Sequence, residues 1–169
     1  LYLQGFGGDT SNAAIAAARA GARTAYLTQV GADAFGRSLL QLWAHEGVNA
    51  SGVTTSADSP TGIYFVSHRP QGHEFHYLRS ASAASRMTPH WLSGAPTELI
   101  SHAHFLHLSG ISLAISAGAC DTGFEAMETA RDAGTRVAFD SNLRLKLWPL
   151  ARARACITQA VALCDVFLP

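Results

Sequence analysis

The sequence predicts an α/β fold, in which a mostly parallel sheet is covered by helices on both faces. Segments with helical spacing of apolar residues alternate with short apolar runs that are typical of buried strands. Glycine or proline stands at many junctions between these segments, where such residues start or end helices. In a chain of 169 residues, 48% are hydrophobic and 14% charged, a composition typical of a globular domain with a sizeable core.

The first elements surround a glycine turn. Residues 1–6 have the composition of a strand that enters this turn, and we treat them as native rather than as the remnant of a tag. An alanine-rich helix is expected over residues 10–20. Asp9 or Thr10 is able to cap its start, and Gly21 to end it.

A buried strand is predicted at residues 24–30 and an amphipathic helix directly after it, ended by Gly47. The apolar residues of this helix recur at helical spacing and are predicted to be core: Phe35, Leu39, Leu42 and Trp43.

The middle of the chain has a different character. Residues 63–68 and 74–79 are short alternating strands around a turn-rich segment, which indicates a β-hairpin. A serine-rich segment follows. A helix start is expected at Thr88 and Pro89, because proline suits the first turn of a helix.

The strand–helix rhythm then returns, with right-handed crossovers expected. We predict strands at residues 105–108, 137–140 and 165–168, a helix at 119–133 ended by Gly134, and a helix from Pro149 to about 163. A doubly wound sheet rarely stops directly after a strand. The sequence therefore predicts that residues 1–169 are the amino-terminal part of one longer domain, with lid strands at about 61–80.

Composition also excludes several function classes. Twelve basic residues balance twelve acidic ones, so neither a nucleic acid nor another polyanion is an expected partner. No apolar run reaches membrane-spanning length, and no signal peptide is recognisable. Three cysteines without a CxxC pattern favour a reducing compartment, and we expect a cytoplasmic protein. The three histidines at 102, 104 and 107 are expected to be strand residues rather than metal ligands.

Ligands of such sheets bind beyond the carboxyl ends of the strands. The turn of Gly7 and Gly8 allows close backbone approach, and the following helix start presents free N–H groups. Asp9 and Asn12 add an acceptor and an amide suited to sugar hydroxyls. A tight turn with a helix cap and no ligand is the competing interpretation, and this segment alone favours it.

Two further groups are candidates. Asp140, Asn142 and Arg144 follow a strand directly, and the arginine offers a planar fork of donors to a carboxylate or phosphate. A surface arginine beside an Asx turn is the equally weighted alternative.

Tyr64 lies on one hairpin strand, with Tyr77 and Arg79 on the other. The last two lie on the same face, because side chains alternate along a strand. They form a plausible cover for a polar, acidic small molecule, although a solvated strand face explains them more simply.

Taken together, these segments resemble the pfkB (ribokinase-like) carbohydrate kinases. The similarity is carried, in order, by residues 7–14, 30–36, 46–48, 61–64, 107–111 and 140–144. Ser141 stands where the family usually has proline, which loosens the turn but keeps the functional side chains. Within the family, Tyr77-Leu78-Arg79 and the serine- and alanine-rich segment after it resemble 2-keto-3-deoxygluconate kinase.

The resemblance implies a three-layer ribokinase-like fold and an ATP- and Mg²⁺-dependent sugar kinase. Gly8 and Asn12 would hold the hydroxyl end of the sugar acid, and Gly7 and Asp9 are further substrate-binding candidates. Tyr64 would cover it, Tyr77 and Arg79 would address it from the lid, and Ile111 would line the pocket. Arg144 would stabilise the carboxylate and the transferred phosphate, and Asn142 would contact the nucleotide. The catalytic base and most of the ATP pocket are expected beyond Pro169, so the fragment alone is expected to be inactive.

Three alternatives remain open. They are a fructokinase or other sugar kinase of the same fold, a non-catalytic sugar-acid-binding protein, and an unrelated α/β domain. We also expect a homo-oligomer that associates through the lid, because a small exposed sheet has edges to protect.

Overall fold

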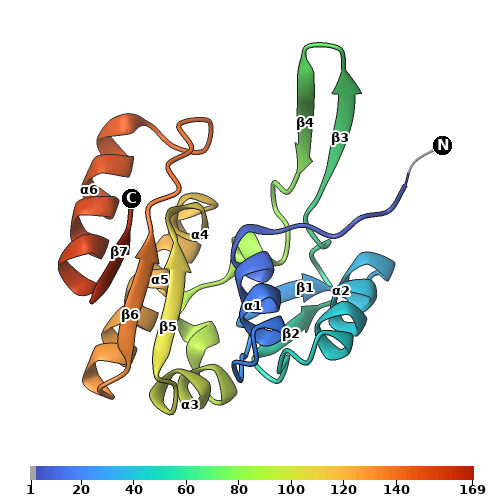
Figure 1. Ribbon diagram of the computed structural model, residues 1–169. Coiled ribbons are helices and arrows are strands. Elements are labelled where there is room, and N and C mark those ends of the chain that lie inside the picture. Colours follow the sequence, from blue (N-terminus) through green and yellow to red (C-terminus); the bar gives the residue numbers. More distant parts are fainter. Residues whose placement is uncertain (1–2) are drawn as a thin grey trace.

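The computed structural model describes residues 3–169, coloured along the sequence in Figure 1. Helices and strands alternate along the chain. Their order is α1 (Asp9–Arg19), β1 (Thr28–Gly31), α2 (Ala34–His45), β2 (Val53–Ser56), β3 (Ile63–Arg69), β4 (Gly72–Leu78), two 3₁₀ turns η1 (Ala84–Arg86) and η2 (Pro89–Leu92), α3 (Ala95–Ser101), β5 (Phe105–Ser109), α4 (Gly110–Ala114), α5 (Ala117–Asp132), β6 (Arg136–Asp140), α6 (Leu150–Leu163) and β7 (Val166–Leu168).

The parallel strands form two groups. β1 pairs with β2, and β6 lies between β5 and β7. The predicted α/β class with parallel strands is confirmed, although β2 and the short helix α4 have no counterpart in the predicted elements. The carboxyl ends of β5 and β6 lie side by side, since Ser109 is the register partner of Asp140.

The predicted hairpin is confirmed. β3 and β4 pair antiparallel over their full lengths around the turn of Pro70 and Gln71, and they stand clear of the α/β body in Figure 1. Both strands are largely exposed. We call this hairpin the lid.

Two apolar clusters hold the body together. The larger one packs α3, α4, α5 and α6 against one face of β5 and β6, with Leu113, Met127 and Phe139 fully buried. On the other face of these strands Phe105 and Arg136 are exposed, and the guanidinium lies 4.1 Å from the ring centroid. The smaller cluster surrounds Trp43 and joins α1 and α2 to β1.

Helix ends follow the local sequence. α1 ends in a Schellman motif, with Gly21 at φ 91° and the N–H of Ala22 bonded to the carbonyl of Ala17 at 3.0 Å. Gly47 and Gly134 adopt positive φ after α2 and α5. At the start of α1, however, Gly8 is the N-cap and no side chain caps the helix, so the expected caps Asp9 and Thr10 are wrong.

Three other expectations differ from the structure. Residues 3–6 form no strand, and Leu3 is 95% exposed with nothing to pair against; residues 1 and 2 of that expected strand lie outside the described part. Phe35 is 46% exposed rather than core, because it lies in the first turn of α2, beyond the edge of the Trp43 cluster. His102 is the C-cap of α3 and His104 precedes β5, so neither is a strand residue.

Within residues 3–169, no helix combines the length and apolar character that crossing a membrane requires.

Candidate active site

The carboxyl ends of β5 and β6 and the amino end of α1 meet at one edge of the body. Gly110, directly after β5, has no room for a side chain, because an added Cβ would collide with the carbonyl oxygen of Ser141 after β6. The same post-β6 loop contacts α1 through Asn142 and Asp9. The structure therefore brings together two of the predicted segments that are more than 130 residues apart in the sequence.

Asn142 is the centre of this contact. Its backbone N–H donates to Asp140 Oδ1 at 3.0 Å, and its side-chain Nδ2 donates to Asp9 Oδ1 at 2.7 Å. Its φ of 31° lies in the left-handed region, which asparagine tolerates better than most residues. The other oxygen, Asp9 Oδ2, is buried and has no hydrogen-bond partner among residues 3–169. A buried acceptor left unsatisfied costs about 1–3 kcal/mol, so a donor from a ligand would be stabilised here.

Next to Asp9 in the sequence, Thr10 shares a 2.9 Å hydrogen bond through its Oγ1 with the hydroxyl of the half-buried Tyr26. Burial raises the pKa of Tyr26, the hydrogen bond from Thr10 opposes this, and the negative charge of Asp9 adds to the rise. The phenol therefore stays neutral and supports the turn at Gly7–Asn12 as a hydrogen-bonding group rather than as a base.

Asp33 attaches the lid to the body. One carboxylate oxygen accepts from Gly36 N and Thr61 Oγ1, both at 2.8 Å, and the other accepts from Thr61 N at 2.8 Å. Thr61 Oγ1 in turn accepts from Gly31 N at 2.9 Å, so the end of β1, the start of α2 and the base of the lid share one network.

Burial alone would raise the pKa of Asp33. The hydrogen bonds from the backbone of Thr61 and Gly36, from the Thr61 hydroxyl and from the Phe35 backbone outweigh this and lower it. No role for Asp33 or Thr61 follows from the sequence pattern. An Asp three residues before Gly36 signals a helix cap, and that signal does not reveal the contact with Thr61.

The lid reaches back over the glycine turn. The Tyr64 hydroxyl lies at Gly7, where a Cβ would overlap it, so glycine is required for this close approach. Tyr64 and Tyr77 are register partners with ring centroids 5.8 Å apart. The Arg79 guanidinium lies 4.4 Å from the Tyr77 ring centroid, so the predicted common face of these side chains is present.

Other predicted residues are not joined to this group. Arg144 is exposed and donates to the carbonyl oxygen of its neighbour Leu143 at 3.1 Å. Ile111 lies in the first turn of α4, with its N–H bonded to Ser109 Oγ at 3.1 Å. Asn12 is exposed on the first turn of α1.

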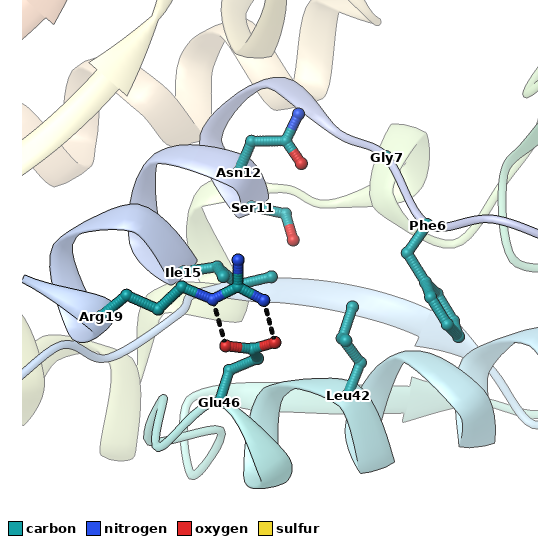
Figure 2. Close-up of a pocket in the computed structure, with 8 residues that line it drawn as sticks. All are labelled: Phe6, Gly7, Ser11, Asn12, Ile15, Arg19, Leu42 and Glu46. Carbon is teal, nitrogen blue, oxygen red and sulfur yellow. Dashed lines mark hydrogen bonds and ion pairs between the residues drawn. The ribbon is translucent and has the colours of Figure 1, made fainter.

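A pocket of about 280 Å³ lies between α1 and α2 beside the glycine turn (Figure 2). Of the predicted residues it is lined only by Gly7 and Asn12. A bidentate ion pair lies on its wall, with Arg19 Nε 2.7 Å from Glu46 Oε2 and Arg19 Nη2 2.5 Å from Oε1. In Figure 2 the Asn12 amide points away from this ion pair, so the pocket lies beside the group around Asp9 rather than within it.

The arrangement is suited to a small polar ligand. It offers a buried carboxylate oxygen, the first-turn N–H groups of α1, two tyrosines and the cation of Arg79. In residues 3–169 no three His, Cys, Asp or Glu side chains are grouped closely enough to hold a metal ion.

The sequence matches the profile of the pfkB family carbohydrate kinases over residues 2–169. Two curated relatives are a 2-dehydro-3-deoxygluconokinase of Thermoproteus tenax, 39% identical over 154 residues, and fructokinase-2 of Solanum habrochaites, 37% identical over 152 residues. Each alignment covers 89% of this chain and 45% of the relative. The chain thus spans about half the length of these relatives.

Solved structures show the same similarity. A PfkB protein from Polaromonas sp. JS666 superposes with a TM-score of 0.89 at 34% identity, over 95% of this chain and 54% of that one. A fructokinase from Xylella fastidiosa with bound ATP superposes with a TM-score of 0.86 at 28% identity, over 95% of this chain and 49% of that one.

Proposed function

Because the chain belongs to the pfkB family of carbohydrate kinases, we propose that the full-length protein transfers the γ-phosphate of ATP to the terminal hydroxyl of 2-keto-3-deoxygluconate (2-dehydro-3-deoxygluconate). The observation that carries this proposal is the approach of the lid to the glycine turn, with Tyr64 at Gly7 and with Tyr77 and Arg79 on the same face. A sugar acid needs hydroxyl partners at one end and a cation at the other, and this group supplies both.

Each residue then has a defined task. Asp9 Oδ2 accepts a hydrogen bond from a sugar hydroxyl, which satisfies its buried lone pairs. The N–H groups at the Gly8 end of α1 and the Asn12 amide bind further sugar oxygens, and Ile111 borders the site at the end of β5. Arg79 binds the carboxylate from the lid.

Lid closure would exclude water, so that the phosphoryl group reaches the sugar rather than solvent. Arg144 is assigned to stabilise the negative charge of the sugar carboxylate and of the transferring phosphoryl group. Cationic side chains have this role in phosphoryl transfer. Because Arg144 is exposed, we propose that it turns towards the site when ligands bind. The base that accepts the hydroxyl proton is assigned to the part of the relatives that this chain does not span.

ATP is proposed as the donor because a similar fructokinase structure contains it. Asn142 is assigned to the nucleotide side of the site, through the side-chain oxygen that its bond to Asp9 leaves available. Mg²⁺ would accompany the phosphates. It characteristically keeps several waters and binds through phosphate oxygens and one or two carboxylates.

The direct test is ATP-dependent phosphorylation by the full-length protein, with 2-keto-3-deoxygluconate, fructose and ribose at equal concentration. We expect a clear preference for the sugar acid. A preference for fructose would replace this proposal by the second candidate, a fructokinase, which the 37% identity to a fructokinase favours. Turnover of none of the three, with calorimetric binding of the sugar acid, would indicate a non-catalytic sugar-acid-binding protein.

A substitution tests the role of the lid. Arg79→Ala is expected to raise the KM for the sugar acid by about 10- to 100-fold, the value of a charge-assisted hydrogen bond of about 1.5–3 kcal/mol, without changing that for ATP. Arg69→Ala is the matched control, because Arg69 lies on the opposite face of the lid and pairs with Glu74 at 3.1 Å. Equal changes in both KM values for Arg79→Ala would contradict the assignment.

We propose a cytoplasmic homo-oligomer that associates through the lid. The face of the lid opposite Tyr64 exposes apolar side chains near its base, with Phe65 38% and Leu78 59% exposed, and a two-stranded sheet has unpaired edges. Leu78→Asp should lower the mass measured by analytical ultracentrifugation, whereas Leu145→Asp, a residue 57% exposed outside the lid, should not. A monomeric parent protein would disprove this association.

A further inference from the structure

Two histidines face each other near the tip of the lid, and neither takes part in the proposed kinase site. His68 and His73 are register partners on β3 and β4, and one further pair, Arg69 with Gly72, separates them from the turn. Their Nδ1 atoms lie 3.0 Å apart, and the rings meet edge to face with centroids 4.6 Å apart. Both side chains are exposed, so solvent ions reach them freely.

This spacing is that of a hydrogen bond between the two rings, and it also fits a chelate. Two nitrogens bound to one ion at about 2.0–2.1 Å lie about 2.8–3.0 Å apart when the angle at the ion is 90°, and about 3.3–3.4 Å apart at a tetrahedral angle. The observed 3.0 Å matches the right angle. Adjacent nitrogen positions at 90° are characteristic of square-planar or octahedral Cu²⁺ and Ni²⁺ sites.

The surroundings permit a cation at this place. The neighbouring Arg69 lies on the opposite face of the hairpin, where Glu74 neutralises it at 3.1 Å. The Glu74 carboxylate also lies 3.7 Å from His76 Nε2, and it is therefore engaged away from the pair. In Figure 1 the tip of the lid stands clear of the body, which leaves the remaining coordination positions to water.

We propose that His68 and His73 form a two-histidine site for a divalent transition-metal ion of the Ni²⁺ or Cu²⁺ type, which joins the two strands at the tip of the lid. In the metal-free pair one Nδ1 carries the hydrogen that the other accepts. On binding, that hydrogen moves through solvent to Nε2 of the same ring, so both Nδ1 atoms coordinate and the neutral pair loses no net proton. This site is distinct from the Mg²⁺ of phosphoryl transfer, because Mg²⁺ prefers oxygen ligands.

The test is calorimetric titration of the full-length protein with Ni²⁺, and separately with Mg²⁺, for the parent protein and three single variants. His68→Gln and His73→Gln each remove one ligand. His76→Gln is the matched control, as an exposed histidine on the opposite face of the same hairpin. Mutation of a residue that only hydrogen-bonds a metal ligand typically lowers the metal affinity 10- to 100-fold. Loss of one of two direct ligands is therefore expected to lower the Ni²⁺ affinity at least tenfold.

We expect the parent protein to bind one equivalent of Ni²⁺, and Mg²⁺ not to bind in its place. The Ni²⁺ affinity should fall in His68→Gln and in His73→Gln and stay unchanged in His76→Gln. Hydrogen exchange of the β3 and β4 amides should slow with Ni²⁺ in the parent protein and in His76→Gln only. The same exchange without metal shows whether each variant keeps its hairpin. Unchanged Ni²⁺ affinity in either ligand variant with an intact hairpin, or an equal loss in His76→Gln, would overturn the proposal.

Discussion

Asn142 Nδ2 donates a 2.7 Å hydrogen bond to Asp9 Oδ1, across 133 residues of sequence. This bond fixes the start of α1 against the loop that follows β6. The other Asp9 oxygen is buried without a partner among residues 3–169. The Asn142 amide is therefore the main protein group that stabilises the Asp9 carboxylate.

We therefore predict that Asn142→Gly lowers the free energy of unfolding by about 1.5–3 kcal/mol, the usual value of a hydrogen bond to a charged group. Glycine is the informative replacement, because it tolerates the φ of 31° and so removes the amide without adding backbone strain. Asn142→Asp should destabilise more, since it places a second carboxylate against Asp9. Urea denaturation measures both, and an Asn142→Gly variant as stable as the parent would show that the bond carries no net stability.

The Asp33–Thr61 network predicts a dependence of stability on acid. The folded-state pKa of Asp33 is lowered, since its hydrogen bonds outweigh the effect of burial. The carboxylate therefore adds stability above its unfolded-state pKa of about 4, and that contribution is lost as the pH falls through the lower folded-state value. Asp33→Asn should be less stable than the parent at pH 7, and the difference should shrink below about pH 4. A difference that stays constant down to pH 2 would contradict this.

Gly7 and Tyr64 are predicted to be energetically coupled. Gly7→Ala pushes the Tyr64 hydroxyl away from the turn and should raise the KM for the sugar about tenfold or less, because the ring end is able to move. Tyr64→Phe removes the oxygen that the new Cβ meets, and the nearest remaining ring atom is then 3.0 Å away. The effect of Gly7→Ala should therefore be smaller in the Tyr64→Phe background. Strict additivity in this double-mutant cycle would refute the contact.

Ala81, just after the lid, has a φ of 57°. A residue with a Cβ loses about 1–2 kcal/mol in this conformation, and glycine does not. Ala81→Gly should stabilise the protein by up to about 1 kcal/mol once the greater chain entropy of glycine is included. Ala16→Gly, at an exposed position inside α1, is the control and should destabilise by about 1 kcal/mol. Thermal unfolding of the two variants should therefore shift in opposite directions.

Local patterns in the sequence determine most elements of this fold. The apolar spacing around Trp43 predicts α2, the glycines at 21, 47 and 134 predict helix ends, and alternation on either side of Pro70 predicts the lid. These signals act over a few residues, because capping, turn geometry and amphipathic burial depend on near neighbours. The same periodicity predicts that Phe35 lies in the core, and this prediction is wrong. The apolar face of α2 extends beyond the Trp43 cluster, so Phe35 at its start stays exposed.

The composition of the candidate site is also predictable, since the segments after parallel strands converge on one edge of a sheet. The contacts within it are not. The bond from Asn142 to Asp9, the approach of Tyr64 to Gly7 and the hold of Asp33 on Thr61 depend on how α1, the lid and the strands pack. Each contact joins groups at least 28 residues apart, and such distances are fixed by tertiary packing rather than by any local pattern. The sequence by itself thus determined the elements and the chemical types at the site, and only the tertiary structure decided which of those groups meet.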